Sequence, residues 1–188
     1  MARIIHRALA VIVTGALLSA CDSTPGVGDQ EHRAMLHEQA QAAIVDFKNA
    51  DPSIQHFFDN AHAYVVFPNI TAAAAGVGGA GGAGETYEQG KFAGYADVTK
   101  GSVGAQVGAE KFAEIIFFET TSSYLDFTNS VLELDAQATA VAASRGAGAT
   151  ASYRRGVAIF TMPLDGLMAQ AAIGGQKFRY EAADQPTR

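Results

Sequence analysis

The sequence has little that could brace the fold covalently: its 188 residues include one cysteine, Cys21, and no tryptophan. A single cysteine excludes an intrachain disulfide, even in an oxidising compartment. Basic residues are also scarce, with 13 Lys and Arg against 19 Asp and Glu and a formal net charge of −6. Because a nucleic-acid partner requires a basic surface, this balance argues against nucleic-acid binding.

Catalytic and metal-binding motifs are missing as well. His32 and His37 are five residues apart and His56 and His62 are six apart, so neither pair shares a helical face as metal ligands would. The sequence contains no G-x-S-x-G elbow, Walker loop or H-E-x-x-H motif. We therefore expect a protein that is not an enzyme and that holds neither a metal ion nor a cofactor.

The apolar run from Ala8 to Leu18 is too short to span a bilayer, which takes roughly 20 residues. It follows a short basic start and precedes small residues, which is the order of a secretory signal peptide. Leu18-Ser19-Ala20-Cys21 resembles a bacterial lipobox. We therefore expect residues 1–20 to be a lipoprotein signal peptide and Cys21 to carry the lipid, whose acyl chains anchor the protein to a membrane.

Cleavage before Cys21 would leave 11 basic and 19 acidic residues, a net charge of −8. Residues 21–30 are polar and contain Pro25, which is typical of a flexible tether. We expect the protein on the periplasmic face of a bacterial membrane. Asp22 resembles a signal for retention in the inner membrane of enteric bacteria, and the outer membrane remains the alternative.

Two helices are predicted at the start of the mature chain. Within Glu31 to Asn49, five apolar residues recur at helical spacing and form one stripe: Leu36, Ala40, Ala43, Ile44 and Phe47. Asp51-Pro52 then indicates the N-cap and first residue of a short second helix. We expect both helices to pack on a sheet; the alternative is a helix lying in the membrane interface.

From Ala63 onward the pattern predicts strands. A short strand from Ala63 should end at Pro68, and the apolar Ile115 to Phe118 indicates a central strand. Other expected elements are strands at 92–99, 102–109, 134–143, 157–162 and 167–173, a helix at 122–130 and a turn at 163–166. The sequence thus predicts an α+β fold, with N-terminal helices packed on a glycine-rich, mainly antiparallel curled sheet or partial barrel.

Eleven glycines lie between Gly76 and Gly108. Residues 76–81 match G-x-G-x-x-G, but a dinucleotide site needs a helix directly after the glycines, and here a strand is predicted instead. Glycine within strands more often permits strong bending or the close approach of another segment. The glycine cluster therefore favours a curled sheet over a nucleotide site.

Basic residues gather late in the chain, with six bases against three acids from Ser144 to Arg188. They are mixed there with aromatic residues, a composition that can contact phospholipid headgroups. The candidate lipid contacts are Tyr153, Arg154, Arg155, Lys177 and Arg179. The alternative is the solvated end of an ordinary strand.

Several segments together resemble the SYLF domain, a lipid-binding family also described as a yeast-type actin-regulator domain. The matching segments are 63–68 (AYVVFP), the glycine run 76–84, 101–109 (GSVGAQVGA), 115–118 and 156–160. The family-motif glycines are Gly76, Gly78, Gly79, Gly101, Gly104 and Gly108. The resemblance spans about residues 30–181, so we expect a SYLF-like domain at 31–183 and a short tail at 184–188.

The resemblance implies a domain that binds phospholipid without catalysis, with phosphoinositides and actin filaments as ligands of eukaryotic members. This chain departs from that pattern, because a lipoprotein of a bacterial envelope does not meet actin and because its first helix is not basic. We therefore expect a phospholipid membrane as both anchor and ligand. The alternative is a structural or interaction protein of the envelope that binds an unknown protein partner.

Overall fold

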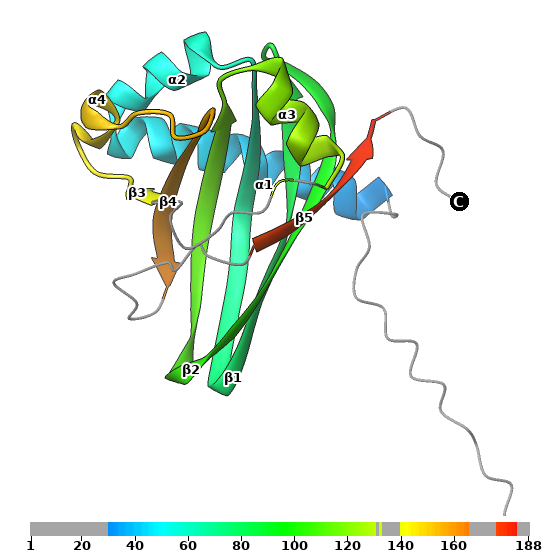
Figure 1. Ribbon diagram of the computed structural model, residues 1–188, viewed down its shortest axis with the longest axis vertical. Helices are drawn as coiled ribbons and strands as arrows, with labels where there is room; N and C mark the ends of the chain where they lie inside the picture. The colour runs from blue at the N-terminus through cyan, green and yellow to red at the C-terminus, as the bar shows by residue number, and fades with distance from the viewer. Residues whose placement is uncertain (1–29, 131, 133–139, 166–175, 184–188) are drawn as a thin grey trace, which may run out of the picture.

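The computed structural model describes residues 30–130, 132, 140–165 and 176–183, with the backbone alone described at 74–77 and 102–108. The helices and strands follow in this order (Figure 1): α1 (Gln30–Ala50), η1 (Pro52–Ile54), α2 (Gln55–Asn60), β1 (Ala63–Glu88), β2 (Lys91–Phe118), α3 (Thr121–Thr128), β3 (Ala140–Ala142), α4 (Ala147–Thr150), β4 (Val157–Asp165) and β5 (Gln176–Ala182). The predicted α+β class, with N-terminal helices on a mainly antiparallel, curled sheet, is confirmed.

The described strands form one five-stranded sheet in which β2 pairs with β1, β4 and β5, and β3 pairs with β4. Residues 111–118 of β2 pair with β4, while residues 94–100 pair with β5. All pairings are antiparallel except β3 with β4, which is parallel. β4 and β5 therefore lie on two different stretches of the same long strand.

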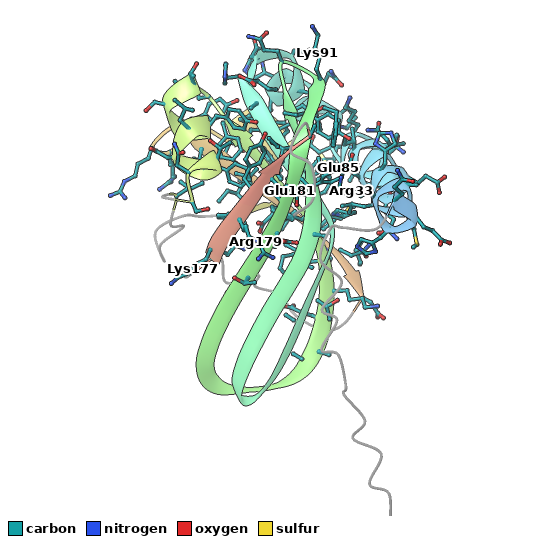
Figure 2. The ribbon with its side chains drawn as sticks, turned by 90° about the vertical axis from the view of Figure 1, so that its right-hand side faces the viewer. Arg33, Glu85, Lys91, Lys177, Arg179 and Glu181 are labelled. Atoms are coloured by element: carbon teal, nitrogen blue, oxygen red, sulfur yellow. The ribbon has the colours of Figure 1, made fainter. Side chains whose placement is uncertain are left out.

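β1 and β2 form one long hairpin. The paired strands bend together at the end far from the helices, so the hairpin folds back on itself (Figure 2). Ala63 pairs with Phe118 at the open end of the hairpin. The backbone N–H of Gln89, at the hairpin turn, nevertheless donates to the carbonyl of His62 at 2.9 Å. The hairpin turn therefore lies beside the start of β1, so the sheet is curled.

Glycines allow the two halves of β1 to touch. A Cβ on Gly84 would lie 2.5 Å from the carbonyl oxygen of Val66, and one on Gly82 would lie 2.5 Å from that of Asn69. No side chain fits at such distances, so the bare backbone is what permits the contact. The expectation that strand glycines serve bending and close approach is confirmed at these two positions.

The sheet separates two apolar cores. Outside the curl, the predicted stripe of α1 is buried against residues such as Val66 and Ile115, together with Phe57 of α2. Inside the curl, Phe67 and Ile116 pack with Phe127 of α3 and other apolar residues. The prediction that the first two helices pack on a sheet is therefore confirmed. In the described part of the chain, no helix has both the length and the apolar character needed to cross a membrane.

Several predicted strand boundaries are wrong. Pro68 does not end a strand, because it lies in a bulge between Phe67 and Ile70, where the ladder is interrupted and a missing N–H is tolerated. The strands expected at 92–99, 102–109 and 115–118 are parts of the single strand β2. The residues between them, 100–101 and 110–114, continue the strand.

The end of the chain also differs from expectation. β4 continues through Pro163 to Asp165, beside another register shift, so the turn expected at 163–166 does not begin there. β5 is not among the strands expected from the apolar pattern, although the end of a strand is the alternative for Lys177 and Arg179. The strand expected at 134–143 is described only from residue 140, where it forms β3. The strand expected at 167–173 lies outside the described residues. The predicted N-cap at Asp51 and the helix near 122–130 are confirmed.

Candidate functional site

Strand alternation separates the basic and aromatic residues of β5. Phe178 is buried inside the curl, whereas Lys177 and Arg179 are exposed on the opposite face. Tyr180 points back inside, and its hydroxyl donates to the carbonyl of Ala93 at 2.9 Å. The exposed pair Lys177 and Arg179, called the β5 basic face below, therefore presents cations without neighbouring rings from its own strand.

Arg179 is already paired. Its Nη2 and Nε both donate to Oδ2 of Asp97 on β2, at 2.8 and 3.2 Å. The Arg179 side chain is 78% exposed, so the pair contributes only about 0.2–1 kcal/mol and a phosphate can compete with it. Lys177 forms no ion pair among the described residues.

An ion pair fastens the start of α1 to the end of β5. Arg33 Nη2 lies 2.8 Å from Oε1 of Glu181, and its guanidinium also lies 4.6 Å from the ring centroid of Tyr95. Figure 2 shows Arg33 and Glu181 side by side, with Arg179 and then Lys177 following along β5. The β5 basic face thus runs away from the first turn of α1.

The other predicted contacts lie elsewhere. Arg154 and Arg155 are exposed in a tight turn, in which the backbone of Arg154 pairs with Val157. This turn leads into β4, and Gly156, its last residue, lies close to Ser123 of α3. The structure therefore keeps Arg154 and Arg155 together, but on a different stretch of the sheet from the β5 basic face.

Tyr153 is placed as a packing residue. Its ring lies 5.2 Å from that of Phe57, and its hydroxyl is buried with no hydrogen-bond partner among the described residues. Burial, with a smaller contribution from Glu119, raises the pKa of Tyr153 to about 12. Contact between this phenol and a headgroup would require the side chain to leave its packed position.

A polar seam joins α1 to the tip of the hairpin. His37 Nδ1 lies 3.0 Å from Oε2 of the buried Glu85, and the Tyr87 hydroxyl donates to the same oxygen. Gln41 Nε2 in turn donates to the Tyr87 oxygen at 2.8 Å. Burial and then the Glu85 carboxylate raise the pKa of Tyr87, so this phenol remains a neutral structural donor.

Sequence reasoning missed a row of aromatic rings that crosses this seam. The rings follow one another from α2 to β2 at centroid distances of 5.0–6.2 Å: Phe58, Tyr64, Tyr87, Phe92 and Tyr95. Arg33 lies over the last ring, and Lys48 lies over the first at 4.4 Å. These residues come from separate helices and strands, so no single segment of sequence carried the signal.

The family-motif glycines lie on facing stretches of β1 and β2. Gly79 pairs with Gly101 across the two strands, and Gly78 pairs with Ser102. Gly76, Gly104 and Gly108 belong to the same backbone. Cys21 lies outside the described residues. Among the described residues, no cluster of three His, Cys, Asp or Glu side chains could hold a metal ion.

No family model matches this chain. The chain is similar to Beta cell expansion factor A of Aeromonas veronii, with 29% identity over 157 residues. The match covers 79% of this chain and 57% of the relative, so the chain spans little more than half the length of that protein. The name of the relative states an effect on beta cells and names no ligand.

Proposed function

We propose that this chain is a SYLF-like lipoprotein of the bacterial envelope, anchored through Cys21, whose domain binds phospholipid without catalysing a reaction. The observation that supports this most directly is the ion pair between Arg33 and Glu181, because it joins the start of α1 to β5. The lipid anchor would enter the domain at that start.

The length of the tether limits where the membrane can lie. Cys21 precedes Gln30, the first residue of α1, by nine positions. An extended chain spans at most about 3.6 Å per residue, so the start of α1 would lie within about 30 Å of the lipid. Because Arg33 contacts Glu181, the β5 basic face would begin near the point where such an anchor enters the domain.

The chemistry of the β5 basic face suits phosphate groups. Each Lys or Arg near an anionic leaflet contributes about 1 kcal/mol, a contribution that salt screens. The mature net charge of −8 opposes approach to the same leaflet, so binding by the free domain should be weak. Anchoring raises the effective concentration of the domain at the bilayer, which makes weak contacts sufficient.

Vesicle co-sedimentation of the Cys21→Ser chain tests this function. We expect binding to vesicles that contain phosphatidylglycerol, weaker binding to phosphatidylcholine alone, and loss of binding in high salt. Lys177→Gln with Arg179→Gln should weaken binding by up to about 30-fold, from two contributions of about 1 kcal/mol. The matched control, Lys111→Gln with Arg145→Gln, removes the same charge from exposed positions elsewhere and should change it little.

Two outcomes would overturn the function. If the Cys21→Ser chain bound neither kind of vesicle, lipid contact would come from the anchor alone. Crosslinking in cells to a reproducible protein partner would then favour the alternative, an interaction protein of the envelope.

A further inference from the structure

Two buried oxygens inside the curl have no hydrogen-bond partner among the described residues, and they belong to two side chains that contact each other. Glu114 of β2 is fully buried, on the face that also carries Phe112 and Ile116. Nε2 of Gln176, the first residue of β5, donates to Glu114 Oε2 at 3.3 Å. Oε1 of Glu114 and Oε1 of Gln176 have no partner among the described residues.

The protonation state of Glu114 decides whether those two oxygens can be satisfied. An ionised carboxylate only accepts hydrogen bonds, and an amide oxygen also only accepts, so the ionised pair leaves both atoms unpaired. Buried polar atoms without partners are costly, and a buried charge is costlier still. A proton on Glu114 supplies the missing donor for Gln176, and acid and amide can then exchange two hydrogen bonds.

The surroundings favour the protonated form. Burial raises the pKa of Glu114 to about 7, against smaller lowering contributions from the Gln176 hydrogen bond and from Lys100. The charged group that acts on Glu114 is Lys100 of β2, which also interacts with Glu110, and the register partners of Glu114 on β1 and β4 are the uncharged Phe67 and Thr161. Among the described residues neither Lys100 nor any other cation forms an ion pair with Glu114, so the attraction of Lys100 only partly offsets the cost of burying the charge.

The contact between Glu114 and Gln176 also bridges two parts of the sheet. The backbone of β5 pairs with residues 94–100 of β2. Glu114 belongs instead to the stretch 111–118, which pairs with β4. The side-chain contact therefore ties the first residue of β5 across the inside of the curl, while Phe178 and Tyr180 hold the rest of β5 against α3.

We propose that Glu114 and Gln176 form a proton-operated latch that closes β5 across the curled sheet when Glu114 is protonated and loosens it when Glu114 is ionised. The latch rests on the contact between Glu114 and Gln176 and not on the proposed lipid binding, although it acts on the strand that carries the β5 basic face. It would make the exposure of the curl interior depend on the pH outside the inner membrane. Loosening would be confined to the Gln176 end of β5, because the remaining contacts of the strand do not titrate with Glu114.

Amide hydrogen exchange of the full mature chain, corrected for the intrinsic effect of pH, tests the latch. Amides at 176–178 should lose protection by up to about tenfold for each pH unit between 4.5 and about 7 and then level off, while amides at 180–182 should change less. Glu114→Gln keeps a donor for Gln176 in every condition and should make the protection of β5 independent of pH. Glu110→Gln removes the neighbouring carboxyl and should retain the wild-type pH dependence.

Two results would overturn the latch: β5 protection in the wild type that does not change with pH, or the same pH dependence in Glu114→Gln. If Glu114→Gln fails to fold, the carbon-13 shift of the wild-type Glu114 carboxyl decides instead. A midpoint near 7 supports the latch, and a midpoint near the ordinary value of 4.5 overturns it.

Discussion

At the scale of single residues, Asp51 shows how one carboxylate joins distant segments. It accepts hydrogen bonds from the N–H and hydroxyl of Ser53, and from the N–H groups of Gly146 and Gly148 nearly one hundred positions later. Burial raises the pKa of Asp51, but these hydrogen bonds together lower it by more, so the net change is downward. The side chain caps η1 and also holds α4 against it.

Asp51→Ala should lower the free energy of unfolding by about 2–4 kcal/mol, since it removes an N-cap and leaves buried donors unpaired. Urea denaturation measures this change. Asp59→Ala, an exposed aspartate on α2, is the control and should cost less than about 0.5 kcal/mol. Because the folded pKa of Asp51 is depressed, its contribution is present above 3.8 and is lost as the pH falls through the folded pKa. Equal losses in the two variants would contradict the role of Asp51.

At the scale of elements, the fold depends on a hairpin that touches itself. Gly84→Ala would bring a Cβ within 2.6 Å of the Phe67 ring as well as against the Val66 carbonyl. We expect it to lower the free energy of unfolding by about 1–3 kcal/mol through overpacking. Thermal or urea denaturation provides the measurement.

Gly101→Ala is the matched control, because a Cβ there meets nothing within 4 Å. It should lie within about 0.5 kcal/mol of the wild type. If both alanine variants were equally stable, the close approach of the two halves of β1 would not be what requires glycine.

The same elements show what sequence can and cannot predict. The buried stripe of α1 was read correctly residue by residue, because helical periodicity is a local signal. The sequence does not predict the full length of β2, because glycine and short polar stretches normally mark the ends of strands. Pairing with β1 along the whole strand is what keeps it continuous. The contact between Arg33 and Glu181 joins residues 148 positions apart, and no pattern within a segment reports such a contact.

At the scale of the whole molecule, Glu114 should make folding stability depend on pH. Its folded pKa of about 7 is raised above the ordinary 4.5, so the native state binds the proton more tightly than the unfolded chain. The stabilisation is complete below 4.5 and is lost as the pH rises to about 7, by about 3 kcal/mol in total. Urea denaturation across this range should show the decline, and Glu114→Gln should flatten it. A wild type equally stable at both ends of the range would contradict the raised pKa.

Also at this scale, the two groups of predicted basic contacts, on β5 and in the turn before β4, would orient the domain differently on a membrane, and this difference can be tested. An orientation set by the anchor puts β5 and the first turn of α1 beside the leaflet. An orientation set by Arg154 and Arg155 would instead bring the turn before β4 to the lipid, because that turn lies on another stretch of the sheet.

Paramagnetic relaxation by spin-labelled lipid headgroups distinguishes these orientations most directly. Amide signals of the Cys21→Ser chain would be recorded with phosphatidylglycerol nanodiscs that carry the label. We predict the strongest attenuation at residues 177–181 and 30–34. Attenuation concentrated at 153–156, or no attenuation anywhere in the domain, would contradict phospholipid binding through the β5 basic face.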